Sequence, residues 1–204
     1  MTVAVVFVII VTMSLPERLT VGAAWMLPAL MGVLCIALIA TDPGRITKES
    51  RTLRWLSIAL VVTMVISTLS STALLVRDLI EGASEVQSAS SLLASGGSVW
   101  LINIVAFALL YWEFDCGGAP RRARAMPEVP DFAFPQQLQP TIAARGWRPT
   151  FVDYLYVGVT TSVAFSPTDT MPLAHWAKLT MSLQAIISLL LLGLVVARAV
   201  NVFQ

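Results

Sequence analysis

The polar side chains that could do chemistry in this chain are concentrated in residues 151–204, which are otherwise largely apolar. Gln184 and Ser188 are four positions apart, a spacing that places them on one face of a helix. Thr160 and Thr161 lie in the preceding apolar segment. Amide and hydroxyl groups can line a path for a small ion or solute, or they can join helices by hydrogen bonds. Both interpretations of these four residues stay open from the sequence.

Three more polar residues flank the same segments. Asp153 stands near the start of a helix, where a carboxylate favours the positive end of the helix dipole, and an ionisable residue in a membrane segment is also a functional candidate. Ser166 and Asp169 begin and end a Ser-Pro-Thr-Asp turn. We expect Asp169 to N-cap the last helix by accepting N–H bonds near Met171 and Pro172, with an outer ion site as the alternative.

Patterns typical of catalysis or metal binding do not occur in the sequence. There are no paired carboxylates inside an apolar segment, no HExxH, no P-loop and no dinucleotide fingerprint. Cys35 and Cys116 form no CxxC pattern, and His175, the single histidine, has no partner at ligand spacing. We therefore expect no enzyme, no metal site and no cofactor. With a net charge of +1, we expect no nucleic-acid partner.

The composition predicts that these residues are held by helices in a lipid bilayer. The chain has 204 residues, of which 57% are hydrophobic and 12% charged, with a mean hydropathy of +0.80. A soluble domain carries about 25% charged residues. The prediction is a single all-α domain, a polytopic membrane bundle with five or six membrane segments. These segments are 3–15, 21–40, 55–76, 98–114, 151–166 and 173–203.

The first segment, residues 3–15, decides whether the number of membrane segments is five or six. A spanning helix needs about 20 apolar residues, and residues 3–15 would extend only about 20 Å at 1.5 Å per residue. No basic residue precedes them and no small-residue cleavage site follows, which favours a retained segment over a signal peptide. Whether this segment crosses the membrane stays open.

The long loop at residues 115–149 is rich in proline and basic. Its prolines exclude a regular helix or an interior strand along its length. The piece at 131–134 could lie on lipid headgroups or belong to a poorly ordered linker. The loop could hold anionic headgroups or a partner through its arginines, which are Arg121, Arg122, Arg124, Arg145 and Arg148.

The basic residues also predict an orientation. If all six segments cross, ten basic residues lie on the side of the 115–149 loop and three lie on the other side. Basic loops stay in the cytoplasm, so both termini and this loop are predicted to be cytoplasmic. The ten are Arg45, Lys48, Arg51, Arg54, Arg121, Arg122, Arg124, Arg145, Arg148 and Arg198, and the three are Arg18, Arg77 and Lys178.

The stretch Thr160-Thr161-Ser162-Val163-Ala164-Phe165-Ser166 resembles the pore region of tetrameric potassium channels. In that family a Thr-rich pore helix leads into Thr-Val-Gly-Tyr-Gly, and a long inner helix follows. The resemblance implies a channel-like hairpin over about a quarter of the chain, with residues 173–203 in the place of the inner helix. It also implies assembly as a homo-oligomer around a shared axis.

Two observations argue against a potassium-selective filter. Ala164 and Ser166 replace both filter glycines, and a side chain resists the left-handed backbone angles by about 1–2 kcal/mol per residue. In addition, a pore loop of that family enters from outside, which would put the basic 115–149 loop outside. We therefore predict that residues 151–166 form a full helix that crosses from inside to outside.

The C-terminal quarter also resembles a bacterial membrane protein family of unknown function. The resemblance rests on Asp153-Tyr154-Leu155-Tyr156, on the Ser166–Asp169 turn, and on Ala199-Val200-Asn201 at the end of the last helix. It implies a multi-pass protein of the bacterial cytoplasmic membrane and adds nothing about a substrate.

Together these observations predict a homo-oligomeric pore or permease for a small ion or solute, of channel-like ancestry. Its path would be lined by Gln184, Ser188, Thr160 and Thr161. The alternative is a non-conducting scaffold or regulatory subunit that uses the basic loop to bind lipid or a partner.

Overall fold

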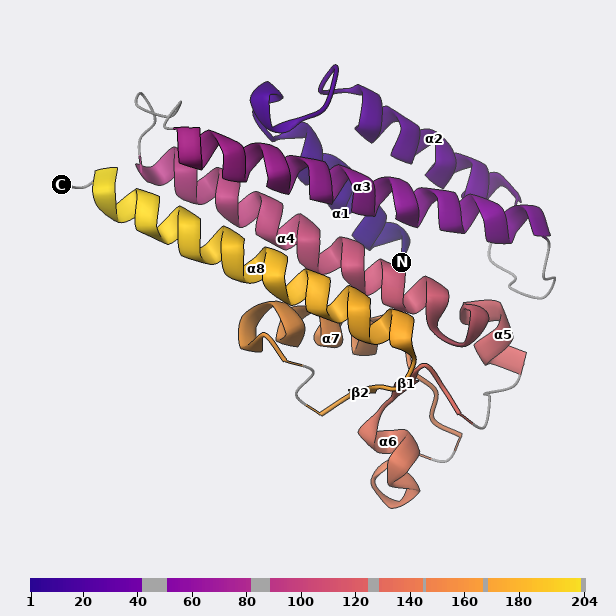
Figure 1. Cartoon of the computed structure of the whole chain (residues 1–204). Coiled ribbons are helices and arrows are strands. Elements are labelled where there is room, and N and C mark those ends of the chain that lie inside the picture. Colours follow the sequence, from indigo (N-terminus) through magenta and orange to yellow (C-terminus); the bar gives the residue numbers. More distant parts are fainter. Residues whose placement is uncertain (42–50, 82–88, 125–128, 145, 167–168, 203–204) are drawn as a thin grey trace.

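The computed structural model of the protein describes residues 1–41, 51–81, 89–124, 129–144, 146–166 and 169–202. Three long helices run side by side through it: α3 (Arg51–Glu81), α4 (Ala89–Phe114) and α8 (His175–Val202) (Figure 1). The remaining elements are α1 (Thr2–Met13), η1 (Glu17–Leu19), α2 (Met26–Thr41), η2 (Asp115–Gly117), α5 (Ala119–Arg124), β1 (Phe132–Ala133), α6 (Pro135–Leu138), η3 (Pro140–Ile142), α7 (Phe151–Ala164) and β2 (Met171–Pro172).

The prediction of a helical bundle is confirmed, because every predicted apolar segment contains a helix. The long helices α3, α4 and α8 are each apolar and long enough to cross a membrane. Helices α1 and α2, with 12 and 16 residues, are shorter than a full span. The count of five or six spans stays a prediction.

Helix α4 is the centre of the bundle and packs against α1, α3, α7 and α8. Two glycines allow its closest contacts. A Cβ at Gly96 would lie 2.5 Å from a methyl carbon of Val195 on α8, and a Cβ at Gly158 of α7 would lie 2.9 Å from the Ile104 carbonyl oxygen. Small residues at these points let the helix backbones approach, as is common in membrane bundles.

Contacts between helices define the two ends of the bundle. At one end, called the α7 end below, Arg54 at the start of α3 pairs with Glu113 near the end of α4 at 2.8 Å. Phe114 there contacts Trp176 at the start of α8, with ring centroids 5.9 Å apart. Gly96 and Val195 lie toward the opposite end, which holds the start of α4 and the end of α8 (Figure 1).

A two-stranded antiparallel ribbon joins the 115–149 loop to the segment just before α8. Phe132 of β1 pairs with Pro172 of β2, and Ala133 pairs with Met171. The N–H groups of Leu173 and Ala174 also donate to the Asp131 carbonyl oxygen, at 2.8 and 3.3 Å. Directly bonded segments lie on the same side of any membrane. The pairing therefore argues against the predicted crossing from inside to outside over residues 151–166.

Helix α7 begins at the α7 end and does not run the length of the bundle, so we call it a half-helix. It has 14 residues and so extends only about 21 Å. The chain then returns to β2, and α8 runs from there to the opposite end (Figure 1). The described end of α8 therefore lies at the opposite end of the bundle from the 115–149 loop, and the membrane side of the C-terminus stays a prediction.

The 115–149 loop is folded onto the bundle, which differs from both expectations for residues 131–134. Phe132 and Phe134 are buried, at 0% and 3% exposed, and pack on Tyr154. The prolines still limit regular structure to short elements. Pro135 and Pro140 stand at the first positions of α6 and η3, where a missing N–H does no harm.

An engineered disulfide tests this arrangement. Ala133→Cys with Met171→Cys, in a background without Cys35 and Cys116, should oxidise readily because paired antiparallel residues lie about 4.5–5.5 Å apart, within disulfide reach. The measurement is the mobility shift of the full-length protein on a non-reducing gel after mild oxidation in membranes.

The matched control is Ala133→Cys with Val196→Cys, since Val196 is exposed near the far end of α8. If both pairs stay reduced, or if thiol labelling finds positions 133 and 171 on opposite membrane faces, the half-helix is refuted.

Candidate functional site

The first polar cluster holds α7 to α4 and α8, and Gln184 is at its centre. The Tyr111 hydroxyl donates to Gln184 Oε1 at 2.6 Å. Gln184 Nε2 in turn donates to the Gly158 carbonyl oxygen and to Ser162 Oγ, both at 2.9 Å. Gln184, Tyr111 and Ser162 are all 0% exposed. The amide thus has its partners within one copy of the chain.

Ser188, one turn further along α8, is used in a similar way. It accepts a hydrogen bond from Asn103 Nδ2 at 3.1 Å, and both residues are 0% exposed. The three hydrogen bonds of Gln184 and the one of Ser188 join α8 to α4 and α7 at buried positions. Within a single copy of the chain, Gln184 and Ser188 therefore connect helices and do not line a path.

Thr160 and Thr161 face different surroundings. The Thr160 hydroxyl donates back to the carbonyl oxygens of Tyr156 and Val157 on its own helix, at 2.9 and 3.1 Å. Thr161 is 1% exposed, and in the described part of the chain its hydroxyl has no hydrogen-bond partner. The four predicted lining residues thus do not share one surface in a single copy.

A small hollow does lie inside the hairpin, between α7, the returning chain and α8. Its volume is about 170 Å³. Thr161 and Ser166, both singled out from the sequence, line it together with Lys178 and Ser182 of α8. Phe165 turns the chain here, with a left-handed φ of 53° at the C-cap of α7. The hollow is therefore lined by the buried hydroxyl of Thr161, the exposed hydroxyls of Ser166 and Ser182, and the ammonium group of Lys178.

The residues predicted to act at helix ends have different outcomes. Asp153 does serve the start of α7, since its Oδ2 accepts from the Thr150 N–H at 2.6 Å and from the Thr150 hydroxyl at 2.8 Å. The helix start that we expected near Met171 and Pro172 lies later in the chain, and the capping role of Asp169 stays a prediction. Helix α8 begins at His175, and Met171 and Pro172 are extended in β2.

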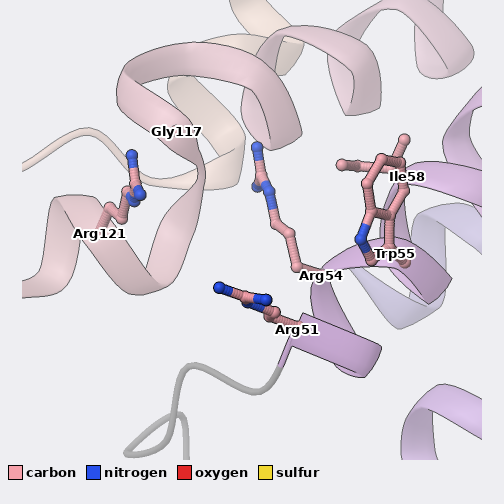
Figure 2. Close-up of a pocket in the computed structure, with 6 residues that line it drawn as sticks. All are labelled: Arg51, Arg54, Trp55, Ile58, Gly117 and Arg121. Carbon is pink, nitrogen blue, oxygen red and sulfur yellow. The ribbon is translucent and has the colours of Figure 1, made fainter.

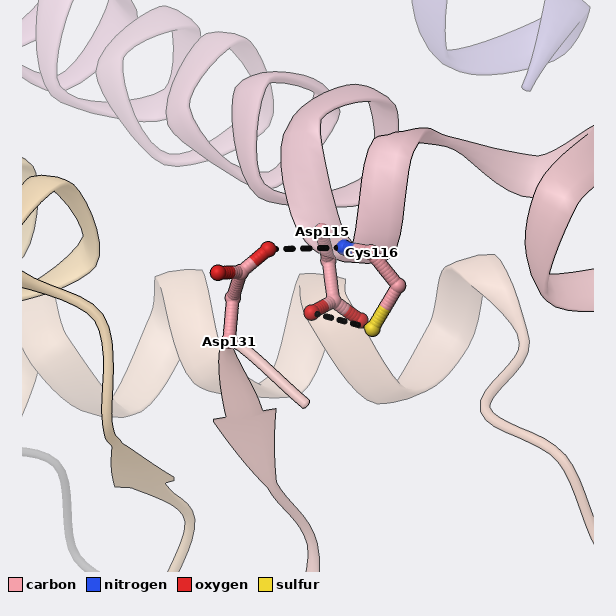
Figure 3. Close-up of side chains that lie close together, drawn as sticks. All are labelled: Asp115, Cys116 and Asp131. Carbon is pink, nitrogen blue, oxygen red and sulfur yellow. Dashed lines mark hydrogen bonds between the residues drawn. The ribbon is translucent and has the colours of Figure 1, made fainter. Parts of the chain in front are cut away.

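A second polar cluster, at the α7 end, surrounds Asp115 directly after α4. Its carboxyl group is fully buried and accepts hydrogen bonds from the Tyr154 hydroxyl, from the Phe132 N–H at 3.3 Å and from Cys116 Sγ at 3.2 Å. Asp131 accepts from the Cys116 N–H at 2.8 Å (Figure 3). The cluster thereby connects α4, β1 and α7.

Arg122 supplies the positive charge of this cluster. It is 3% exposed, and its Nη1 donates to the Asp115 carbonyl oxygen at 2.6 Å. The guanidinium carbon lies 4.5 Å from the ring centroid of Trp112 and 5.0 Å from that of Tyr154. The Tyr154 hydroxyl donates to the Asp115 carboxyl group beside this cation.

Asp115, Cys116 and Asp131 bring their potential ligand atoms within 4.8 Å of one another. Their atoms are however bonded to each other and to backbone N–H groups, and the Arg122 guanidinium lies against the same segment. A nearby fixed cation disfavours a metal ion by Coulomb repulsion. The arrangement fits a structural junction between the loop and the bundle.

The described loop arginines differ in burial. Arg122 is buried in the cluster just described, whereas Arg121 and Arg124 are exposed. Arg148 is exposed and its Nη1 donates to the Ala123 carbonyl oxygen. Arg145 lies outside the described residues.

The sequence analysis missed the Asp115 cluster because its members are far apart in the chain and belong to no motif. Tyr154 and Asp131 are 39 and about 16 residues from Asp115, on either side of a proline-rich stretch. The one available signal was the pair of adjacent polar residues, Asp115 and Cys116, at the end of an apolar segment. Comparisons of the chain with protein-family models, curated proteins and solved structures give no match.

The Gln184 cluster should contribute measurably to stability. Gln184→Leu keeps the volume but leaves the Tyr111 and Ser162 hydroxyls and the Gly158 carbonyl without this partner, which should lower the free energy of unfolding by about 1–3 kcal/mol. The measurement is reversible unfolding in mixed micelles. Ser182→Ala on the exposed face of α8 is the control, and equal stability of the two variants would contradict the proposed role.

The Asp115 cluster can be tested at Tyr154. Tyr154→Phe keeps the ring contacts with Trp112 and Phe134 but removes the hydroxyl donor to a buried carboxyl group. We expect a loss of about 1–3 kcal/mol and faster proteolysis of the 115–149 loop. Tyr156→Phe, on the exposed side of the same helix, should change neither quantity. A Tyr154→Phe protein that resists protease as well as the wild type would argue against the cluster as the loop's anchor.

Proposed function

We propose that this protein is an integral membrane protein in which α7 is a re-entrant half-helix. The observation that carries this proposal is the pairing of β1 with β2, which returns the chain after α7 to the end where α7 began. Backbone that is not helical is tolerated at membrane depth where protein or a water-filled cavity surrounds it. A short helix, a returning segment and a long helix form the same order of elements as a channel pore module.

We infer that the α7 end faces the cytoplasm. Most of the described basic residues lie there, and basic residues are retained on the cytoplasmic side. That end holds Arg51, Arg54, Arg121, Arg122, Arg124, Arg148 and Lys178, and the opposite end holds Arg18, Arg77 and Arg198. The half-helix would then enter from the cytoplasm, and α8 would carry the C-terminus to the other side.

We further propose that copies of the chain assemble and pass a small anion or neutral solute. The support comes from the α7–α8 hairpin, whose outer face exposes large apolar residues that another copy could cover. They include Val152, Tyr156 and Val163 of α7, at 50–69% exposed, and Leu179, Leu183 and Ile186 of α8, at 42–71% exposed. Gln184 and Ser188 serve packing in this proposal, and the path instead begins at the hollow next to Thr161 and Ser166.

Lys178 is what favours an anion or a neutral solute over a cation. It is the one charged residue among those that line the hollow in the described structure. A fixed ammonium group repels cations from a narrow path, and pores for anions use Lys or Arg in this way.

The second candidate is a non-conducting scaffold or regulatory subunit of the membrane. One observation favours it: the amides and hydroxyls of α8 at mid-depth, in Gln184 and Ser188, are fully buried and bonded inside one copy. A conducting path needs polar groups that are open to the solute.

Flux through proteoliposomes distinguishes the two candidates. In a cysteine-free background, Ser166→Cys should permit chloride or glycerol flux, and a charged methanethiosulfonate reagent should then block most of it. Lys178→Gln should reduce chloride flux relative to potassium flux. Val62→Cys on the outer face of α3 is the control and should be indifferent to the reagent.

Insertion of the protein and its oligomeric state are measured on the same vesicles. Correctly inserted protein that passes none of chloride, potassium or glycerol above the level of empty vesicles would reject conduction and favour the scaffold.

A further inference from the structure

A pocket lined by three arginines lies at the α7 end, between the start of α3 and the turn that follows α4. Its volume is about 690 Å³. Figure 2 shows Arg51 and Arg54 reaching it from α3 and Arg121 reaching it from α5. Among the described residues that line it, none carries a carboxylate. The other lining residues are Trp55, Ile58 and Gly117.

Two adjacent glycines leave space for the side chains of Arg54 and Arg121. Gly117 and Gly118 have φ angles of +76° and +97°, which a residue with a side chain rarely adopts. A Cβ at Gly117 would come within 2.6 Å of Arg121 Cδ, and a Cβ at Gly118 would collide with Arg54 Nη1. The turn after α4 thus lets both guanidinium groups lie close to the backbone.

Arg54 is held in place before any ligand arrives. Its Nη1 donates to Glu113 Oε1 and to the Glu113 carbonyl oxygen, each at 2.8 Å. Ser57 donates to the same carboxylate oxygen at 2.6 Å, which fixes the carboxylate in turn. A guanidinium group has five N–H donors, so these bonds orient Arg54 and leave donors for a further acceptor. Preorganised arginines suit the flat, bidentate recognition of phosphate.

The surface of α3 below the pocket is apolar. Trp55, Val62 and Ile66 lie on one side of the helix at spacings of seven and four residues, and they are 69%, 39% and 54% exposed. Trp55 stands at the boundary, where an amphipathic ring is typical of the membrane interface. A phosphate-binding pocket that opens onto an apolar helix face matches a molecule with an anionic head and hydrocarbon chains.

We propose that this pocket binds an anionic phospholipid, with the phosphate between Arg51, Arg54 and Arg121 and an acyl chain along α3. The proposal rests on the membrane location proposed above, and basic pockets at helix ends on the cytoplasmic side are suited to such headgroups. It assigns lipid binding to residues of α3 and α5, whereas the sequence pointed to the whole proline-rich loop.

The test uses the full-length protein in nanodiscs that contain equal amounts of phosphatidylglycerol and phosphatidylcholine. Native mass spectrometry of the protein released from them reports which lipid stays bound. We expect phosphatidylglycerol to be retained preferentially, and Arg51→Ala with Arg121→Ala should reduce that preference about tenfold. The matched control, Arg124→Ala with Arg148→Ala, removes the same charge from the same end outside the pocket and should change it less than about twofold.

Each outcome decides the proposal. An equal loss of preference in both double variants, or no loss in either, would overturn the pocket. Glycerol 3-phosphate is added in a separate arm without lipid, and occupancy by that soluble anion at equal concentration would show a phosphate site that does not need a lipid. The engineered 133–171 disulfide reports that each variant keeps its fold. If it forms and lipid preference is absent, only the pocket is rejected, whereas failure to insert into nanodiscs would reject the membrane location and the pocket together.

Discussion

The two hydrogen bonds from the Leu173 and Ala174 N–H groups to the Asp131 carbonyl oxygen constrain the whole C-terminal half of the molecule. They bind the start of α8 to the loop that follows α4, and β1 and β2 extend the same connection. Because the two segments touch, the chain between them has to begin and finish at one end of the bundle. Helix α7 is a half-helix for this reason, and its 14 residues are a consequence of the connection as much as of its composition.

A half-helix buried against other helices needs specific partners, because it contributes little apolar contact of its own. Here α4 provides a close backbone approach at Gly158 and aromatic contacts at Trp112, and α8 provides the Gln184 amide. The Asp115 carboxyl group holds the first turn of α7 through the Tyr154 hydroxyl. On α7 the Gln184 cluster begins about one turn after Tyr154, at Gly158, and continues to Ser162. Both clusters use groups that would be costly to bury unpaired.

The sequence was sufficient to predict the helices, since their apolar character is local information, and Asp153 was correctly placed at a helix start. The two-stranded ribbon could not be predicted from local sequence patterns. Its strands have two residues each, and their pairing joins positions about forty residues apart through a proline-rich stretch. The expected helix start near Met171 and Pro172 was misplaced for this reason, since these residues pair as a strand and α8 begins at His175. The burial of Phe132 and Phe134 was missed for the same reason.

The charge pattern does not distinguish a full span over residues 151–166 from the proposed half-helix. When α7 is changed from a full span to a half-helix, the segments after it exchange sides. Lys178 at the start of α8 then joins the basic end, while Arg198 near the other end of α8 leaves it. One cation replaces another, so the bias in basic residues is the same for both topologies, and the rule that basic residues stay inside favours each of them equally. Orientation from charge depends on totals, whereas the path of a re-entrant segment depends on a contact between distant residues. For this chain the rule keeps the 115–149 loop in the proposed cytoplasmic position under both topologies, and it does not distinguish the two paths of α7.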